Sequence, residues 1–163
     1  MKLIIVLTLV FSSFLLTAQR GSAVEISLEA ETAVLNGPMK VSPDGQAFNN
    51  LCIEGYKVNR RGWATFTANI PVEGDYVMWG RIHARDGFAN SFYVSVDKTE
   101  SFIWDITKSN RWEWDRVSDR GIGSTVEPSM DPKIFHFEAG EHTFTIGNRE
   151  RDTRLDRIII TDD

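Results

Sequence analysis

The feature that most constrains this sequence is the alternation of apolar and polar residues in short segments separated by turn residues. Residues 63–70 place four apolar side chains on one face of an extended segment, and residues 75–83 alternate in the same way after Pro71 and Gly74. Successive side chains of a β-strand point to opposite faces, so a period of two indicates strands with one buried face. No segment after residue 23 shows the period of an amphipathic helix.

The same alternation recurs at regular spacing along the rest of the chain. Further alternating segments lie at residues 26–30, 92–96, 135–137, 144–146 and 155–160, and turns are expected at Asn36-Gly37-Pro38, around Asp97 and at Ala139-Gly140-Glu141. About ten short strands without helical crossovers are typical of antiparallel sandwiches. The sequence therefore predicts an all-β fold, an antiparallel two-sheet β-sandwich or jelly roll, with no substantial helix outside the N-terminal segment.

The N-terminal segment, residues 1–23, has the pattern of a secretory signal peptide. The basic residue Lys2 precedes an apolar run over residues 3–16, and small residues follow at 21–23. This run is shorter than the roughly 20 residues needed to cross a bilayer, and no cysteine follows it directly to carry a lipid. We therefore expect cleavage after Ala23, with Ala18 as the alternative, and a secreted protein, extracellular or periplasmic, without a membrane anchor.

Residues 24–163 are predicted to form a single domain of 140 residues, which is long enough to bury a hydrophobic core. This region keeps 16 of the 18 basic residues and all 23 acidic ones, so its formal net charge is −7. No nucleic-acid partner is expected, because nucleic acid is itself a polyanion. Cys52 is the single cysteine, which excludes an internal disulfide and a thiolate metal cluster and favours a buried, inert thiol.

Two acidic residues in the first alternating segment indicate a candidate cation site. Glu29 and Glu31 share one face of an extended segment, about 7 Å apart, where their carboxylates repel each other unless a positive charge lies between them. Calcium takes roughly six to eight oxygen ligands, and sandwich folds often bring their first and last strands together, which adds Asp156 as a third carboxylate. The alternative is that the two glutamates form the solvated face of an edge strand.

Four segments together resemble a known family. They are LEAETA near the start, GWATFTANIPVEGDYVMWGRIHA in the middle, FEAGEHTFTI later and LDRIII at the end. These segments resemble the calcium-containing β-sandwich carbohydrate-binding modules of families 6 and 35, and the similarity spans essentially the whole region after the signal peptide. The resemblance implies a galactose-binding-like jelly roll that binds carbohydrate. It also implies that Glu29, Glu31 and Asp156 hold a structural calcium, as the matching residues do in that family.

The sequence departs from the family pattern at one informative position. Those modules typically carry an Asn that binds sugar hydroxyls two residues before the last-strand Asp, and this sequence has Arg154 there. Arg149, Glu150, Arg151 and Arg157 lie close by in the sequence. A guanidinium pairs bidentately with carboxylate or sulfate, so one hypothesis is an acidic polysaccharide whose uronate or sulfate groups meet Arg149 and Arg154. Glu150 is also assigned to the predicted sugar site. The alternative is that these arginines pair with neighbouring acids in a solvated loop.

Five tryptophans are the candidate sugar platforms, because flat aromatic rings pack against the apolar C–H faces of pyranose rings. Trp112 and Trp114 lie two residues apart in RWEWDR, so they share one face if this segment is extended. We predict that this pair stacks on sugar, with Trp104 as the next platform, and that Trp63 and Trp79 lie in the core. The alternative for the pair is that both rings point inwards between the sheets.

Polar side chains on neighbouring segments complete the predicted sugar site. Asn90, in DGFANSF, is expected to hydrogen-bond hydroxyl groups, and Arg81 and His83 share a strand face that would line the groove. His136 and His142 alternate with core residues, which favours structural roles for them. No histidine pair has the spacing of a zinc site.

Two other classes of function stay open at the level of the sequence. A small polysaccharide lyase needs a base beside an arginine, and Arg81, His83 and Tyr93 offer such a set; a glycoside hydrolase needs paired carboxylates, and acids are abundant. The motifs of a nucleophile elbow, a phosphate loop and a metal hydrolase are missing from the sequence. We therefore expect a non-catalytic polysaccharide-binding module, with an unlinked carbohydrate-active enzyme as a candidate partner. An extracellular structural or adhesion protein is the other alternative.

Overall fold

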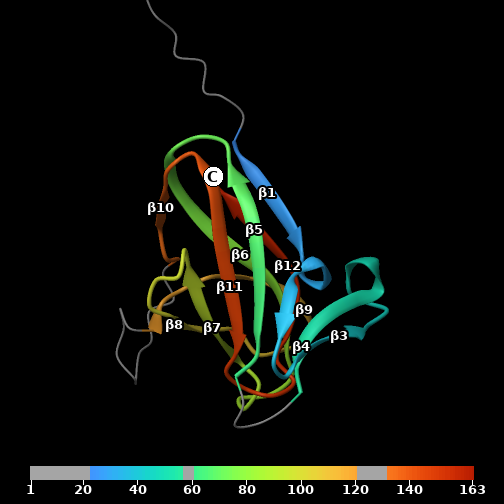
Figure 1. Ribbon diagram of the computed structural model, residues 1–163. Coiled ribbons are helices and arrows are strands. Elements are labelled where there is room, and N and C mark those ends of the chain that lie inside the picture. Colours follow the sequence, from blue (N-terminus) through green and yellow to red (C-terminus); the bar gives the residue numbers. More distant parts are fainter. Residues whose placement is uncertain (1–22, 57–60, 121–131) are drawn as a thin grey trace, which may run out of the picture.

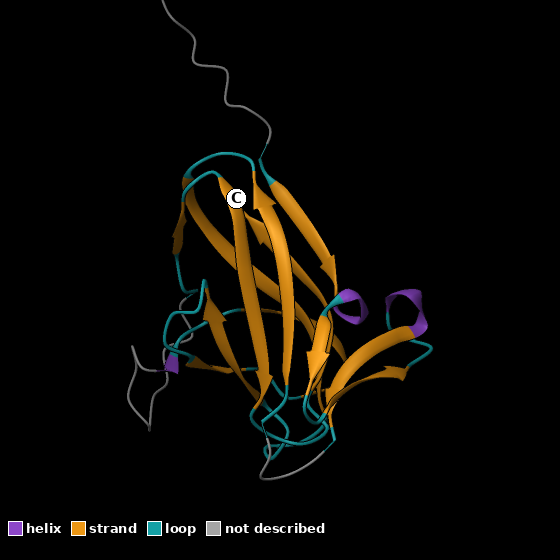
Figure 2. Ribbon diagram, viewed as in Figure 1, coloured by secondary structure: helices purple, strands orange, loops and turns teal. Residues whose placement is uncertain are grey.

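The computed structural model describes residues 23–56, 61–120 and 132–163. In these ranges the chain forms twelve β-strands and two 3-10 helices of three residues each, so the predicted all-β fold is confirmed (Figure 2). The predicted signal peptide lies outside the described residues up to residue 22. Within the described ranges, no helix has both the length and the apolar character needed to span a membrane.

Two antiparallel sheets form the sandwich (Figure 1). The larger sheet consists of β1 (Glu25–Glu29), β3 (Met39–Pro43), β4 (Leu51–Gly55), β6 (Gly74–Ala84), β9 (Ser109–Arg116), β10 (Phe135–Phe137) and β12 (Arg154–Thr161). Its strand order is β10-β6-β12-β4-β3, with β1 also paired to β12 and β9 also paired to β6. The first and last strands are therefore neighbours, as the sequence predicted.

The smaller sheet has five strands in the order β2-β5-β11-β7-β8. They are β2 (Val34–Asn36), β5 (Trp63–Ile70), β7 (Ser91–Val96), β8 (Phe102–Asp105) and β11 (Gly140–Asn148). The 3-10 helix η1 (Ala30–Thr32) follows β1, and the 3-10 helix η2 (Phe48–Asn50) precedes β4. Because β1 and β2 belong to different sheets, η1 lies where the chain crosses from one layer to the other.

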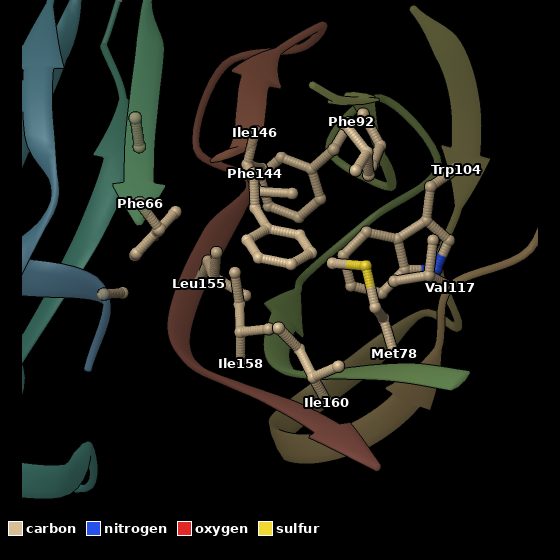
Figure 3. Packing of buried hydrophobic residues seen from close by; sticks show 14 of the residues in the cluster. Phe66, Met78, Phe92, Trp104, Val117, Phe144, Ile146, Leu155, Ile158 and Ile160 are labelled. Atoms are coloured by element: carbon tan, nitrogen blue, oxygen red, sulfur yellow. The ribbon is translucent and has the colours of Figure 1, made fainter. Parts of the chain in front are cut away.

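The core lies between the two sheets and takes one face of each (Figure 3). Strand β5 buries every second side chain, including Phe66 and Ile70, as its alternating sequence predicts. Phe144 from the smaller sheet and Met78, Leu155 and related residues from the larger sheet are fully buried. These side chains form one continuous cluster, which ties both sheets into a single packed unit.

Trp104 belongs to this core, and its predicted role as a sugar platform is wrong. Its side chain is fully buried, with its ring centroid 5.5 Å from that of Phe92 (Figure 3). The indole N–H donates to Asp115 at 3.3 Å. The opposite sheet makes room for this ring at Gly80 of β6, where an added Cβ would lie only 2.4 Å from Cη2 of the indole.

Cys52 is a free, fully buried thiol, as the sequence predicted. Its Sγ lies 3.6 Å from the backbone oxygen of Ser42. Burial raises the pKa of the thiol to about 12. The thiol is therefore protonated at neutral pH, which makes it a small apolar side chain in this position.

Candidate functional site

The outer face of the larger sheet carries three of the five tryptophans. Strand β6 buries every second side chain inwards, which leaves Trp79, Arg81 and His83 on the outer face. Strand β9 pairs with β6 in a register that places Trp114 opposite Arg81. Trp112 shares that face because it lies two residues away on an extended strand. Both indoles of the RWEWDR segment therefore lie outside the core between the sheets.

Trp114 and Trp79 border a groove on this face. Trp114 is 41% exposed, and the two indoles form part of a cavity of about 410 Å³. The other residues that line it come from β1, from β12 and from the residues after β12: Glu25, Ile159, Thr161 and Asp163. A second hollow of about 320 Å³ borders the same two indoles and continues to Arg116 and Ser118. Trp79 and Trp114 border both hollows, which together are called the groove below.

The prediction that Trp79 and Trp63 lie in the core is wrong. Each is only half-buried, and each occupies an outward position of its strand, next to the inward residues Met78 and Ala64. The alternation of these strands carried that information. Their aromatic character suggested burial instead, which is the commoner state for a large indole. Trp79 is the groove residue that the sequence reasoning missed.

Trp112 does not offer the open face that stacking on a sugar requires. It is only 8% exposed, and two outward side chains of β6 cover it. The His83 ring lies 5.6 Å from the Trp112 ring, centroid to centroid, and the Arg81 guanidinium lies 5.4 Å from it. The predicted stacking by Trp112 is therefore wrong for this conformation. The ring instead supports the arginine and histidine beside the groove.

Arg154 is held between two carboxylates on the same outer face. Its guanidinium donates to Glu54 at 2.8 Å and to Asp44 at 3.1 Å. Lys40 also lies 3.0 Å from Glu54. Burial raises the pKa of Glu54, but the Ser42 hydroxyl, Lys40 and Arg154 outweigh it and hold that pKa below its ordinary value. The cluster is therefore ionised and internally paired at neutral pH.

Asn90, Arg149 and Glu150 meet at the loop end of the sandwich, where they bind one another. The Asn90 backbone N–H donates to Glu150 at 2.7 Å, and Arg149 donates to Glu150 and, at 2.8 Å, to Ser91 Oγ. When the side-chain amide of Asn90 is oriented with its nitrogen towards the neighbouring acceptors, its N–H donates to the Gly87 carbonyl at 3.0 Å. These contacts fasten the start of β7 to the connection between β11 and β12.

The predicted third carboxylate of the cation site, Asp156, already has protein partners. It is fully buried at a bulge of β12 and accepts a hydrogen bond from the Phe48 backbone N–H at 3.0 Å and another from Arg81. The Arg81 guanidinium is positively charged and the Phe48 N–H is a hydrogen-bond donor, so these two groups balance the charge of the Asp156 carboxylate without a metal. The Arg81 side chain thus links the outer face of β6 to η2.

Each of the two glutamates of the predicted cation site has one carboxylate oxygen without a hydrogen-bond partner. Glu29 pairs with Arg157 through one oxygen, and Glu31 accepts from Asn49 at 3.1 Å through one oxygen. The second oxygen of each, Oε2, is buried and lacks a hydrogen-bond partner, which is the state that a bound cation relieves. Across the described ranges, no three His, Cys, Asp or Glu side chains are grouped to hold a metal. A cation beside Glu29 and Glu31 would therefore complete its shell with backbone carbonyls and water.

The residues that a polysaccharide lyase would need are not brought together. Arg81 and His83 lie on the larger sheet, whereas Tyr93 lies on β7 of the smaller sheet. The Tyr93 ring instead contacts Arg61, whose guanidinium lies 4.4 Å from its centroid, and Trp63, whose ring lies 6.2 Å away. The predicted base-and-arginine set is therefore wrong.

Comparison with known proteins identifies the fold. No protein-family model and no curated protein matches the chain. Among solved structures, the C-terminal family 6 carbohydrate-binding module of LamC, a marine laminarinase from Zobellia galactanivorans, superposes with a TM-score of 0.62 at 16% identity, covering 85% of this chain and 100% of that one. A family 35 carbohydrate-binding module from Clostridium thermocellum gives a TM-score of 0.61 at 16% identity, with coverages of 83% and 97%.

A larger enzyme contains the same fold. The exo-β-1,3-galactanase from Phanerochaete chrysosporium, in complex with galactose, matches with a TM-score of 0.63 at 19% identity, over 84% of this chain. The chain spans only 29% of that enzyme's length. At these identities the likeness establishes the architecture alone, which is the β-sandwich of carbohydrate-binding modules of families 6 and 35.

Proposed function

We propose that this protein binds a polysaccharide or oligosaccharide on the outer face of its larger sheet and does not cleave it. The observation that carries the proposal is the groove between Trp79 and Trp114, where two indoles lie on the surface beside polar side chains. An aromatic wall covers the apolar face of a pyranose ring, and the polar rim hydrogen-bonds its hydroxyls. The volume of about 410 Å³ is within the usual range of small-molecule sites, roughly 300–1,000 Å³.

The fold supports a carbohydrate ligand over the alternatives. The solved structures that share it include two modules named for carbohydrate binding and a galactanase in complex with galactose. The separation of Tyr93 from Arg81 and His83 removes the lyase set proposed from sequence. Binding without catalysis is therefore the function that this site supports best.

An acidic ligand has weaker support than the sequence suggested. All four arginines of the C-terminal segment pair with carboxylates, which are Glu150 for Arg149, Asp152 for Arg151, Asp44 and Glu54 for Arg154, and Glu29 for Arg157. A uronate or sulfate group would have to displace a carboxylate that already makes charge-assisted hydrogen bonds. The arginines therefore favour a structural role.

Secretion and calcium binding belong to the same proposal. The N-terminal residues 1–23 have the composition of a signal peptide, and polysaccharides are met outside the cell, where a carbohydrate-active enzyme would be a natural partner. The unpartnered oxygens of Glu29 and Glu31 support a calcium ion beside η1. Such an ion would stabilise the junction between the first strand and the crossing to the other sheet.

A glycan array with matched variants tests the proposed function. Replacing Trp114 by Ala should weaken binding of the recognised glycan roughly thirtyfold or more, the scale of an aromatic hot spot of about 2 kcal/mol. The control is Phe88→Ala, which removes an aromatic ring that is 82% exposed and outside the groove. This control should bind as the unchanged protein does, and both variants should keep its melting temperature.

The same array separates the other functions. Reducing or unsaturated sugar ends that accumulate during incubation would show an enzyme instead of a binding module. An array on which no glycan is retained would favour the structural or adhesion role. Equal loss of binding in the Trp114 and Phe88 variants would contradict the assignment of the groove.

A further inference from the structure

The groove is unequally charged along its length. On the β1 side it is lined by Glu25 and Asp163, and on the β9 side by Arg116, whose guanidinium lies 4.6 Å from the Trp79 ring centroid. The Trp79 and Trp114 rings stand between these two ends. A bound ligand would therefore meet carboxylates at one end of the groove and a guanidinium at the other.

The strand pairing explains why two carboxylates gather at the β1 end. Glu25 opens β1 and pairs with Thr161 at the end of β12, so the residues that follow β12 lie beside it. Figure 1 shows the start of β1 and the C-terminal end of the chain at the same end of the molecule. The inward neighbour Ile26 packs on the core, so Glu25 points outwards into the groove.

Both Glu25 and Asp163 are exposed, and neither takes part in an ion pair among the described residues, whereas every arginine from Arg149 to Arg157 does. The nearby Asp162 differs, because its carboxylate accepts a hydrogen bond from the Val24 backbone N–H at 2.6 Å. The end of the groove thus presents unpaired negative charge next to two indole rings.

Indole faces and carboxylates in one cavity form a chemical environment that favours a cation. An ammonium group is attracted to the π-face of a tryptophan and to a carboxylate, and a uronate is repelled by the latter. We propose, resting on the proposed function, that the groove recognises an amino sugar polymer whose ammonium group lies at the Glu25 and Asp163 end. The sugar ring itself stacks on Trp114.

Calorimetric titration of the full chain with three hexamers tests the inference. They are the β-1,4-linked hexamers of glucosamine, of N-acetylglucosamine and of glucose, at a pH at which the glucosamine amines are charged. The glucosamine hexamer should bind about tenfold more tightly than the acetylated one, since acetylation replaces the charged ammonium by a neutral acetamide on the same sugar ring. Added salt should narrow this gap, because the carboxylates are exposed.

Two double variants test whether the preference for the amine depends on these two carboxylates or on the net charge of the protein. Glu25→Gln with Asp163→Asn should abolish the preference for the amine and leave the affinity for the acetylated hexamer unchanged. The control, Glu100→Gln with Glu141→Gln, makes the same change in net charge at exposed positions that do not line the groove. This control should keep the preference.

Each result decides between the inference and the function on which it rests. Equal affinities for the charged and acetylated hexamers, with binding lost in Trp114→Ala, would overturn the amino sugar and keep the carbohydrate site. The same loss of preference in both double variants would also overturn it. If none of the three hexamers binds, the inference fails, and the proposed function stands if the glycan array retains another sugar. If binding survives Trp114→Ala, the groove is not the binding site, so the site assigned under the proposed function and the inference both fail.

Discussion

Gly80 separates two tryptophans that lie on opposite sides of the larger sheet, which are Trp104, reaching the core from β8 of the smaller sheet, and Trp79, its own neighbour on β6. On its inner side it leaves room for the fully buried ring of Trp104 and for Leu155, and its neighbour Trp79 points outwards to the groove. A side chain at position 80 would collide with the ring. The core and the candidate site therefore depend on the same backbone position.

Replacing Gly80 by Ala should destabilise the protein. The new Cβ would lie 2.4 Å from Trp104 Cη2 and 3.1 Å from Leu155 Cδ1, inside a packed core. Overpacking of this kind costs about 1–3 kcal/mol, measurable as a lower midpoint of urea unfolding. Gly45→Ala is the control, because nothing lies within 4 Å of a Cβ there, and it should shift the unfolding free energy by about 0.5 kcal/mol at most. Equal effects of both changes would contradict this packing.

At the level of the elements, the turn between β7 and β8 is fastened to β11 by one histidine. His142 Nδ1 lies 2.6 Å from the Asp97 carboxylate, and Asp97 also accepts from the Thr143 backbone N–H at 2.9 Å. Burial lowers the pKa of His142, but the hydrogen bonds with Asp97 and the Glu138 carbonyl outweigh it and raise that pKa. Burial raises the pKa of Asp97, and Thr143 and His142 outweigh it and lower that pKa.

The pair should make the unfolding free energy depend on pH. Because folding raises the pKa of His142, its protonated form stabilises the folded state at pH values below 6.5, the ordinary pKa of histidine. This contribution is lost as the pH rises through the raised pKa. Because folding lowers the pKa of Asp97, its ionised form stabilises the folded state at pH values above 3.8, the ordinary pKa of aspartate. This contribution is lost as the pH falls through the lowered pKa. The pair therefore contributes most between these two ordinary values and weakens in alkaline solution.

Urea unfolding at pH 6 and pH 8.5 measures this contribution. In the unchanged protein the unfolding free energy should fall between these pH values, with about 1 kcal/mol or less due to His142. His142→Gln should reduce that fall. His136→Gln should change it less, because His136 lies at an exposed position with Asp75. A pH dependence that is the same in His142→Gln as in the unchanged protein would contradict the role of this histidine.

The strands were predictable from the sequence because alternation is a local property. The inward face of residues 63–70 and the turn at Asp97 follow from side-chain direction alone. The adjacency of β1 and β12 was expected from sandwich folds in general, and the structure has it. These features need only the period of the pattern and the usual connections of antiparallel sheets.

The site was less predictable, because it depends on which strands become neighbours. Whether Trp112 is open depends on Arg81 and His83 of β6 lying over it, which no local pattern reveals. The pairing of Arg154 with Asp44 and Glu54 joins three distant segments. Trp79 carried a usable local signal, since it occupies an outward position of an alternating strand.

On the scale of the whole molecule, a calcium ion beside Glu29 and Glu31 would link β1, η1 and the η2 loop. Calcium should therefore raise the free energy of unfolding, by about 2.7 kcal/mol at a concentration of roughly 100 times its dissociation constant. Thermal melts in calcium, in magnesium and in chelator measure this. Glu31→Gln should melt at the same temperature in calcium and in chelator. Identical melts of the unchanged protein in all three solutions would remove the calcium proposal.

The proposed site places the ligand on the outer face of the larger sheet, with Trp79 and Trp114 against it. The five indole N–H signals in an NMR spectrum report on this directly when a glycan retained on the array is added to saturation. The signals of Trp79 and Trp114 should shift, and that of the core residue Trp104 should stay in place. A shift confined to Trp63, on the opposite sheet, would contradict the claim.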